Sequence, residues 1–257
     1  MRHKRNKAGS RDRGEDWLYG RQSVREALRS GRRALFALHA RAQHGDETLE
    51  SLAADAEIPV AHEEARWFER TLGTVHHQGV ALRAGPYPYR DFKDLISEMQ
   101  SREQPGFWLL LDHIQDPQNL GSILRTAEAA GVHGVVLPKD RAAAVTPAVV
   151  RASAGASEHV AICRVSNIVQ AMETLKKSGV WITGLHADAE AKLYTEIDFR
   201  DACGVVLGSE GRGLSRLVRE RCDWLAHLPM LGLVDSLNAG AAGAIVMYEV
   251  ARQRLRV

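Results

Sequence analysis

The sequence Val206-Leu207-Gly208-Ser209-Glu210-Gly211-Arg212-Gly213-Leu214 joins a short apolar run to a turn that contains three glycines. Gly204–Leu207 has the composition of a buried strand and Gly213–Arg221 that of a helix, so the glycines fall in a strand-to-helix turn. Their order is not the GxGxxG of dinucleotide-binding turns, and the Lys-Ser/Thr pair of a phosphate-binding loop does not follow. Glu210 would repel a phosphate. The turn therefore indicates a ligand with a positive charge or a hydroxyl group, or simply a tight connection with a solvated glutamate.

A second polar segment runs from Leu111 to Ala127, after the predicted strand Phe107–Leu111. Asn119 is expected to cap the helix that follows, whose apolar face is marked by Leu120, Ile123, Leu124 and Ala127. Arg125 lies off that face and is free to reach a phosphate or a partner subunit. Taken alone, the segment favours an ordinary capped helix with a surface arginine.

The third segment runs from Leu228 to Ala242, where a strand meets Pro229 and an apolar loop. Ser236 or Asn238 then begins a helix of small residues, predicted over Ser236–Arg256. The two uncharged polar side chains could position a substrate, while the small residues also suit close packing against a sheet.

Strands and helices alternate from Gly106 to the end of the chain, which predicts an open parallel sheet with helices on both faces. Ligands bind such sheets beyond the carboxyl ends of the strands, where all three segments lie. Residues 16–85 alternate in the same way over the length of a small α/β domain. Gly85-Pro86-Tyr87-Pro88-Tyr89 interrupts the pattern, so we expect a linker over 86–104 and a second domain over 105–257.

The net charge of +2 on 257 residues is unevenly distributed. Residues 1–14 carry six Lys or Arg and one Asp, whereas the remainder carries 28 basic and 31 acidic residues. We expect residues 1–15 to be a disordered basic arm that seeks phosphates, although a merely solubilising terminus has the same composition.

The remaining composition is that of a soluble globular protein, 45% apolar and 26% charged. No signal peptide and no apolar stretch long enough to span a bilayer is present, so we expect a cytoplasmic protein without a membrane partner. Cys163, Cys203 and Cys222 lack CxxC spacing, which favours a reducing compartment. The 11 histidines form no metal-binding motif, so no metal is expected.

In combination and in this order, three motifs resemble those of the SpoU (TrmH-type) branch of the SPOUT methyltransferases. They are Asp-Pro-x-Asn-x-Gly at 116–121, Gly-x-Glu-Gly-x-Gly at 208–213 and Ser-Leu-Asn at 236–238. Trp17–Ala84 resembles the ribosomal-protein-like RNA-binding domain that precedes many catalytic domains of this branch. Ala129–His133 and Pro138-Lys139-Asp140-Arg141 are most similar to the bacterial 23S rRNA guanosine-2′-O-methyltransferases.

The resemblance implies a SPOUT α/β fold with a deep trefoil knot, S-adenosyl-L-methionine as methyl donor, and a homodimer with active sites at the subunit interface. It places the functional positions at Asn119, Arg125, Glu210, Ser236 and Asn238, and the cofactor cradle at Gly208, Leu228, Met230 and Leu237. The chain departs from the usual Asn-Val-Ser-Val-Ala, because it reads Asn238-Ala239-Gly240-Ala241-Ala242 and lacks a hydroxyl at 240.

The expected activity is therefore methylation of a guanosine ribose 2′-hydroxyl in 23S rRNA, free or in a ribosome-assembly intermediate. Three alternatives stay open. A tRNA ribose methyltransferase would carry the same catalytic motifs. A non-catalytic RNA-binding or ribosome-assembly protein on this fold would be expected to lose the motif residues, which are all present here. A Rossmann-type oxidoreductase is disfavoured by the order and late position of the glycines.

Overall fold

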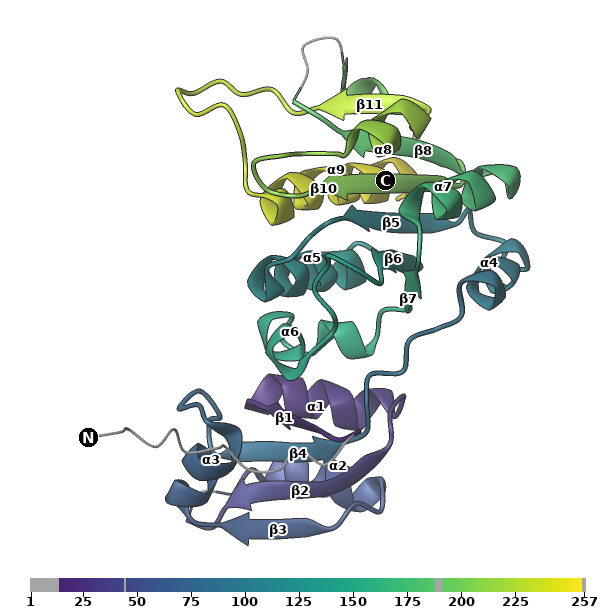
Figure 1. Cartoon of the computed structure of the whole chain (residues 1–257). Helices are drawn as coiled ribbons and strands as arrows, with labels where there is room; N and C mark the ends of the chain where they lie inside the picture. The colour runs from purple at the N-terminus through teal and green to yellow at the C-terminus, as the bar shows by residue number, and fades with distance from the viewer. Residues whose placement is uncertain (1–13, 44, 188–190, 256–257) are drawn as a thin grey trace. The chain divides into compact units, whose positions relative to one another are not determined.

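The computed structural model describes residues 14–43, 45–187 and 191–255, and the chain divides into two compact units, Met1–Pro88 and Tyr89–Val257 (Figure 1). The basic arm expected at residues 1–15 lies almost entirely outside the described residues. No helix in the described ranges is both long and apolar enough to cross a membrane.

The N-terminal unit is a four-stranded sheet with three helices. Its strands are β1 (Asp16–Tyr19), β2 (Leu35–Arg41), β3 (Val60–Glu63) and β4 (Val80–Ala84), in the spatial order β1-β4-β2-β3. Strands β2 and β3 are parallel, and the other pairs are antiparallel. The helices are α1 (Arg21–Ser30), α2 (Glu47–Asp55) and α3 (Ala65–Leu72). Leu18, Leu38 and Leu82 of the sheet and Val24 and Leu49 of the helices are fully buried, so they form the core of this unit.

The C-terminal unit is built on a seven-stranded sheet in which every neighbouring pair is parallel. Its order is β7-β6-β5-β10-β8-β11-β9, with strands at Phe107–Asp112 (β5), Gly134–Pro138 (β6), Ile162–Val165 (β7), Trp181–Leu185 (β8), Lys192–Leu193 (β9), Cys203–Gly208 (β10) and Trp224–His227 (β11). The helices are α4 (Phe92–Gln100), α5 (Pro117–Ala129), α6 (Pro147–Ala152), α7 (Ile168–Lys177), α8 (Arg216–Arg221) and α9 (Ala239–Arg254), with short 3-10 turns at Ala156–Glu158 and Tyr194–Glu196.

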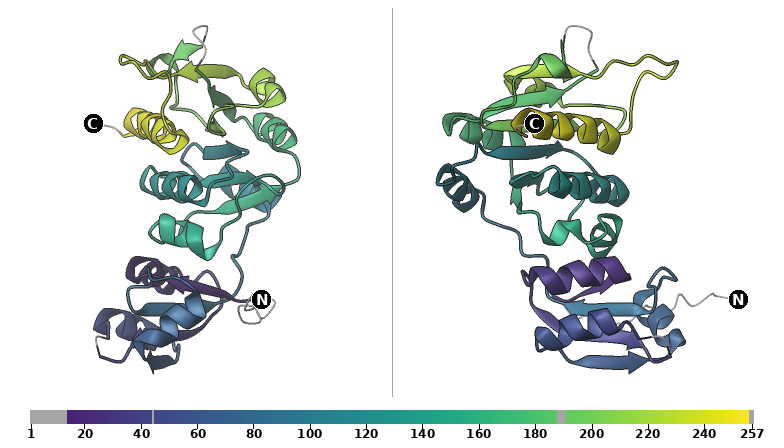
Figure 2. Two further views of the ribbon diagram at one scale, coloured as in Figure 1. Left: turned by 60° about the vertical axis from the view of Figure 1, so that its left-hand side comes forward. Right: turned by 180° about the vertical axis from the view of Figure 1, so that it is seen from behind.

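Helices cover both faces of this sheet, as the sequence predicted (Figure 2). Trp108, Leu110 and Val206 pack with α4, α7 and α8 in one buried cluster. The alternate residues of these strands point to the opposite face, where α9 contacts β10 and α5. On that face Gly243 of α9 lies against Leu207, since a Cβ at Gly243 would lie 2.5 Å from a Leu207 methyl group.

The strand order reverses between β5 and β10. From β5 the chain moves outward through β6 to β7, and it then crosses to the other side to form β8. In open parallel sheets such a reversal opens a crevice at the carboxyl ends of the strands. Gly208 of β10 pairs there with Asp112 of β5, so the turns after both strands start side by side.

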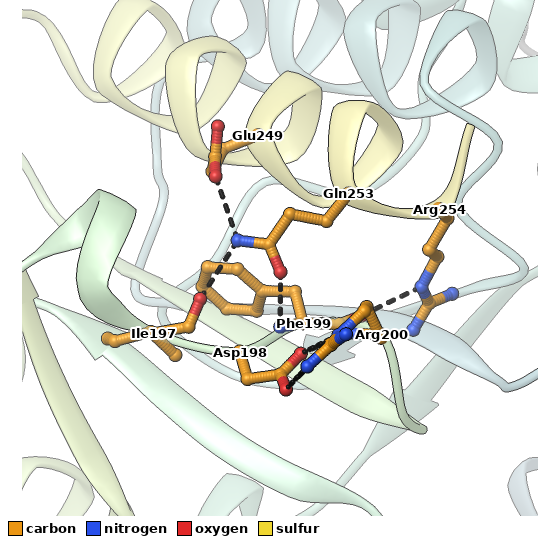
Figure 3. Close-up of polar contacts among 7 residues, drawn as sticks. All are labelled: Ile197, Asp198, Phe199, Arg200, Glu249, Gln253 and Arg254. Atoms are coloured by element: carbon orange, nitrogen blue, oxygen red, sulfur yellow. Dashed lines mark hydrogen bonds and ion pairs between the residues drawn. The ribbon is translucent and has the colours of Figure 1, made fainter. Parts of the chain in front are cut away.

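Helix α9 is anchored by its C-terminal turn (Figure 3). The Gln253 side chain accepts a hydrogen bond from the Phe199 amide (2.8 Å) and donates to the Ile197 carbonyl (2.9 Å). The Arg254 guanidinium donates to the Phe199 carbonyl (2.9 Å) and to Pro105 (2.9 Å). This end of the helix is therefore tied to the amino-terminal edge of the central strands.

Several expected boundaries were wrong. Residues 86–104 are not a linker, because Asp91 caps helix α4, whose Leu95 and Met99 enter the core of the C-terminal unit. Helix α9 begins at Ala239 rather than at Ser236, and α8 begins at Arg216 rather than at 213. The trefoil knot stays a prediction.

The three cysteines are free thiols on separate elements: Cys163 in β7, Cys203 in β10 and Cys222 after α8. Burial raises the pKa of Cys163 and Cys222 to about 12 and that of Cys203 to about 11.

Candidate functional site

A cavity of about 600 Å³ lies at the carboxyl edge of the sheet. The turns after β8, β10 and β11 form three of its sides, and the segment before α9 forms the fourth. All four residues expected to cradle a cofactor line it, namely Gly208, Leu228, Met230 and Leu237. Three of the five expected catalytic residues line it as well, namely Glu210, Ser236 and Asn238.

The glycine turn after β10 is closed by two backbone hydrogen bonds between Ser209 and Gly213, of 3.2 and 2.9 Å. Gly211 and Gly213 have φ angles of 77° and 63°, which side chains other than glycine rarely adopt. Gly208 is required for a different reason, since a Cβ there would lie 2.1 Å from the Gly213 carbonyl carbon. The turn therefore folds back on its own strand and brings bare backbone to the cavity.

Asp112 holds this turn in place from the neighbouring strand. Its side chain is buried, and Oδ2 accepts a hydrogen bond of 2.7 Å from the Ser215 amide, while Oδ1 contacts Nδ1 of His113. Asp112 was not among the site residues expected from the sequence. An acidic residue that ends an otherwise apolar strand was the signal, because such a carboxylate is buried only where partners satisfy it.

The three motifs meet at Asn238. Its Oδ1 caps α9 by accepting hydrogen bonds from the amides of Gly240 (2.9 Å) and Ala241 (3.3 Å). Its Nδ2 donates to Oδ1 of Asn119 (2.9 Å) and to Oε1 of Glu210. An amide NH₂ has two donors, and both are used here. Asn119, Glu210 and Asn238, which we call the polar junction, thus form one hydrogen-bonded unit beside the cavity.

The position of Asn119 corrects its expected role as the cap of α5. Asp116 is the cap and accepts a hydrogen bond from the Asn119 amide (3.1 Å), and Pro117 occupies the first helical position. Because the Asn119 side chain is released from capping, it is available to Asn238.

The departure from the family motif at Gly240 coincides with a close approach of α9 to α5. A Cβ at Gly240 would lie 3.1 Å from Asn238 Oδ1 and 3.4 Å from Ser122 Oγ. The hydroxyl of Ser122 therefore lies near the place where the motif's own serine is missing.

Ser236 and Arg125 are not part of the polar junction. Ser236 is exposed at the cavity wall, with Oγ 3.4 Å from Asp235 Oδ1. Arg125 is exposed on α5, does not line the cavity, and has no ion pair among the described residues.

His186 lines the cavity but was not among the site residues expected from the sequence. It follows β8, and its Nε2 accepts a hydrogen bond from Arg219 (3.2 Å), since a guanidinium has no acceptor. A single histidine after an apolar strand gave no signal. No group of three or more His, Cys, Asp or Glu that could hold a metal occurs in the described ranges.

Two family models match the chain. Residues 106–248 match the SpoU rRNA Methylase family, and residues 17–90 match the domain described as RNA 2′-O ribose methyltransferase substrate binding. Among curated proteins, a putative TrmH family tRNA/rRNA methyltransferase of Staphylococcus saprophyticus is 47% identical over 178 residues, which is 69% of this chain and 71% of that protein. The Bacillus subtilis protein YacO, with the same description, is 38% identical over 93% of this chain and 96% of its own.

Solved structures have the same fold. The SpoU methyltransferase AviRb from Streptomyces viridochromogenes, in complex with AdoMet, superposes with a TM-score of 0.80 at 23% identity over 97% of this chain and 96% of its own. A putative RNA methyltransferase of the TrmH family from Porphyromonas gingivalis gives a TM-score of 0.72 at 26% identity, over 93% and 90% of the two chains.

Proposed function

The chain belongs to the SpoU rRNA methylase family and is an S-adenosylmethionine-dependent RNA methyltransferase; from this premise we propose that it methylates the ribose 2′-hydroxyl of a guanosine in 23S rRNA. The observation that carries the proposal is the polar junction, because residues from three separate motifs converge beside one cavity. The match of residues 17–90 to a ribose methyltransferase substrate-binding domain supports a ribose target.

The cavity fits S-adenosylmethionine in three respects. It has the volume of a small-molecule site, apolar walls from Leu228, Met230 and Leu237, and a glycine turn that leaves backbone polar groups uncovered. A side chain at Gly208 would overlap the Gly213 carbonyl group and displace the turn that lines the cavity. When bound, the cofactor supplies an electrophilic sulfonium methyl group.

The polar groups around the cavity suit the positioning of a ribose. Asn119 and Ser236 carry uncharged hydrogen-bonding groups that can orient a hydroxyl or a phosphate. Glu210 holds Asn238, and Asn238 holds both Asn119 and the start of α9. Fixing the attacking oxygen in line with the methyl group supplies much of the rate enhancement expected of such a site.

We further propose that the active enzyme is a homodimer in which Arg125 enters the partner's site. Arg125 is exposed on α5 next to α9, and α9 exposes the apolar residues Ile245 and Tyr248. A guanidinium stays protonated, so Arg125 is suited to hold a phosphate and to stabilise the developing oxyanion rather than to remove a proton. The free thiols and the RNA substrate support a cytoplasmic location.

Mapping of ribose methylation in 23S rRNA and tRNA tests the substrate. Cells lacking the protein should lose one mark at a 23S guanosine, and the purified protein should restore it on rRNA or on a ribosome-assembly intermediate. Loss of a tRNA mark instead would refute the rRNA assignment.

Arg125→Ala tests the proposed mechanism. We expect loss of methyl transfer with an unchanged sedimentation coefficient and unchanged binding of S-adenosylhomocysteine. Turnover close to that of the unmodified protein would remove Arg125 from the mechanism.

A further inference from the structure

The segment Pro138-Lys139-Asp140-Arg141 begins at the last residue of β6 and leaves the sheet at the same edge as the cavity. Lys139 and Arg141 are exposed, and neither has an ion pair among the described residues. Many other cations of this unit are paired, for example Lys176 with Asp223 (2.7 Å) and Arg216 with Glu220 (2.8 Å). Asp140 stands between them in the chain, so the loop carries a net charge of +1, and the Lys139 and Arg141 side chains remain available to an anion.

The loop that carries them is fixed through its backbone. The Lys139 amide donates to the Val165 carbonyl (2.8 Å), and the Lys139 carbonyl accepts from the Arg164 guanidinium. On the other side, the Arg141 carbonyl accepts from the Gln115 side chain (3.3 Å). The loop is thus tied both to β7 and to the 112–116 turn, while the Lys139 and Arg141 side chains are left free.

The loop that follows β6 and the 112–116 turn also share an uncommon backbone conformation. Five non-glycine residues in the described ranges have a positive φ, and two of them, His113 (63°) and Arg141 (55°), lie in these loops. A residue with a long side chain loses free energy in the left-handed conformation, whereas glycine and asparagine adopt it at lower cost. Such costs persist where function requires the residue, so Arg141 is a candidate for a functional role.

Lys139 and Arg141 lie at a distance from the cavity at which they could contact the nucleotides that flank a target nucleotide. Strand β6 is two positions from β10 in the sheet, which is about 10 Å at the spacing of neighbouring strands. Between them the 112–116 turn leads into α5 and Asn119. An RNA strand whose target ribose meets the polar junction can therefore continue over Lys139 and Arg141.

We propose that Lys139 and Arg141 form a phosphate clamp that holds RNA beside the target nucleotide. The inference rests on the proposed RNA substrate and adds a binding site for it. Exposed, unpaired cations on a rigid loop bind phosphates without reading sequence. The clamp thus supplies affinity and register, and the polar junction selects the ribose.

The test compares Lys139→Gln/Arg141→Gln with a matched control, Lys93→Gln/Lys177→Gln. Lys93 of α4 and Lys177 of α7 are exposed, have no ion pair among the described residues and do not line the cavity, so the control removes two equivalent charges elsewhere on the same unit. Binding of an unmodified 23S rRNA transcript is measured between 50 and 200 mM salt. Loss of two phosphate contacts should make the slope of log K against log salt less steep by about 1.4. The ratio of the unmodified protein's affinity to that of the double variant should therefore fall about sevenfold between 50 and 200 mM salt. The control should keep the original slope.

Binding of S-adenosylhomocysteine should be unchanged in both variants, which shows that the fold and cavity are intact. Lys139→Gln alone should give half of the effect and serves if the double variant is unstable. An original slope in the clamp variants would overturn the clamp. Absence of methyl transfer by the unmodified protein on any RNA would instead overturn the proposed function, and the salt slopes would still report on the clamp.

Discussion

Asn238 combines two tasks in one side chain. Its oxygen caps α9, and its nitrogen joins the motifs at Asn119 and Glu210. Aspartate retains a capping oxygen but cannot donate, whereas alanine does neither. The two substitutions therefore separate the structural task from the functional one.

Asn238→Ala should cost about 1 kcal/mol of unfolding free energy through loss of the cap, and Asn238→Asp should retain the cap. Both should lower methyl transfer at least about tenfold, because the polar junction comes apart. Urea unfolding and single-turnover kinetics measure the two effects. An aspartate variant with full activity would contradict the role given to the amide nitrogen.

Gly208→Ala should abolish cofactor binding, because the new Cβ would overlap the Gly213 carbonyl group and force the turn away from its strand. Gly232→Ala is the control, since a Cβ there meets nothing within 4 Å and the residue lies in the loop between β11 and α9, which supplies another wall of the cavity. Calorimetric titration with S-adenosylhomocysteine should show no binding to the first variant and near-normal binding to the second. Normal binding to both would mean that the turn tolerates a side chain.

Residue types and spacing were enough to identify which motifs share a site, but not how each side chain is used. Asparagine is a residue type that often caps helices, so Asn119 was expected to cap α5. Asp116 takes that position instead, because Pro117 suits the first position of the helix. Asp112 was missed because its burial depends on Ser215, 103 residues away in the chain. The Arg125 side chain has no hydrogen bond or ion pair among the described residues, so the role expected for it stays a prediction.

The C-terminal turn of α9 is held by Gln253, whose side chain bonds the backbone carbonyl of Ile197 and the backbone amide of Phe199, as a neighbouring strand would in a sheet (Figure 3). Gln253→Ala should cost about 1–3 kcal/mol, because it leaves an amide and a carbonyl without partners. Gln170→Ala, at an exposed position of α7, should cost little. Denaturant unfolding compares the two, and equal stabilities would contradict the anchoring role.

Glu249 should make the stability of the C-terminal part of α9 depend on pH. Hydrogen bonds from Arg252 lower the pKa of this buried carboxylate below its ordinary value of 4.5. A pKa that is lower in the folded state means stabilisation above pH 4.5 that is lost as the pH falls through the folded-state value. Glu249→Gln should therefore lose stability relative to the unmodified protein at pH 7 but less so near pH 3. A difference that does not change with pH would rule out this linkage.

Helix α4 illustrates why the boundary between the two units was placed too late. Pro86 and Pro88 do mark a break, and the units divide at Pro88. The helix that follows is short, and its Leu95 and Met99 become informative only through contact with the sheet of the C-terminal unit. Strands β5, β6 and β10 were predictable because each is a continuous apolar run buried on both faces.

Over the whole molecule, charge is concentrated where RNA is expected. The body carries a small negative excess, and residues 1–14 carry most of the positive charge that is not balanced nearby. RNA recognition should therefore be local, through the arm and the carboxyl edge of the catalytic sheet, rather than through a uniformly basic surface.

Deletion of residues 1–14 should weaken RNA binding most at low salt and reduce the salt slope by up to about 4, since six cations are removed. An arm of the same length with its Lys and Arg changed to Gln should behave like the deletion. Filter binding over a salt series measures both. An unchanged affinity and slope would leave the arm as a solubilising terminus only.

The three separated thiols also allow local opening of the folded chain to be measured by chemical labelling. Cys163 and Cys203 are buried in strands β7 and β10, Cys222 is partly buried after α8, and all three are protonated at neutral pH in the folded state. Alkylating reagents attack thiolates, so labelling of the two buried cysteines requires that their strands first become exposed. Mass spectrometry of pulse-labelled protein would then give separate opening rates for the edge strand β7 and the central strand β10, with Cys222 as the more accessible reference thiol and without any engineered probe.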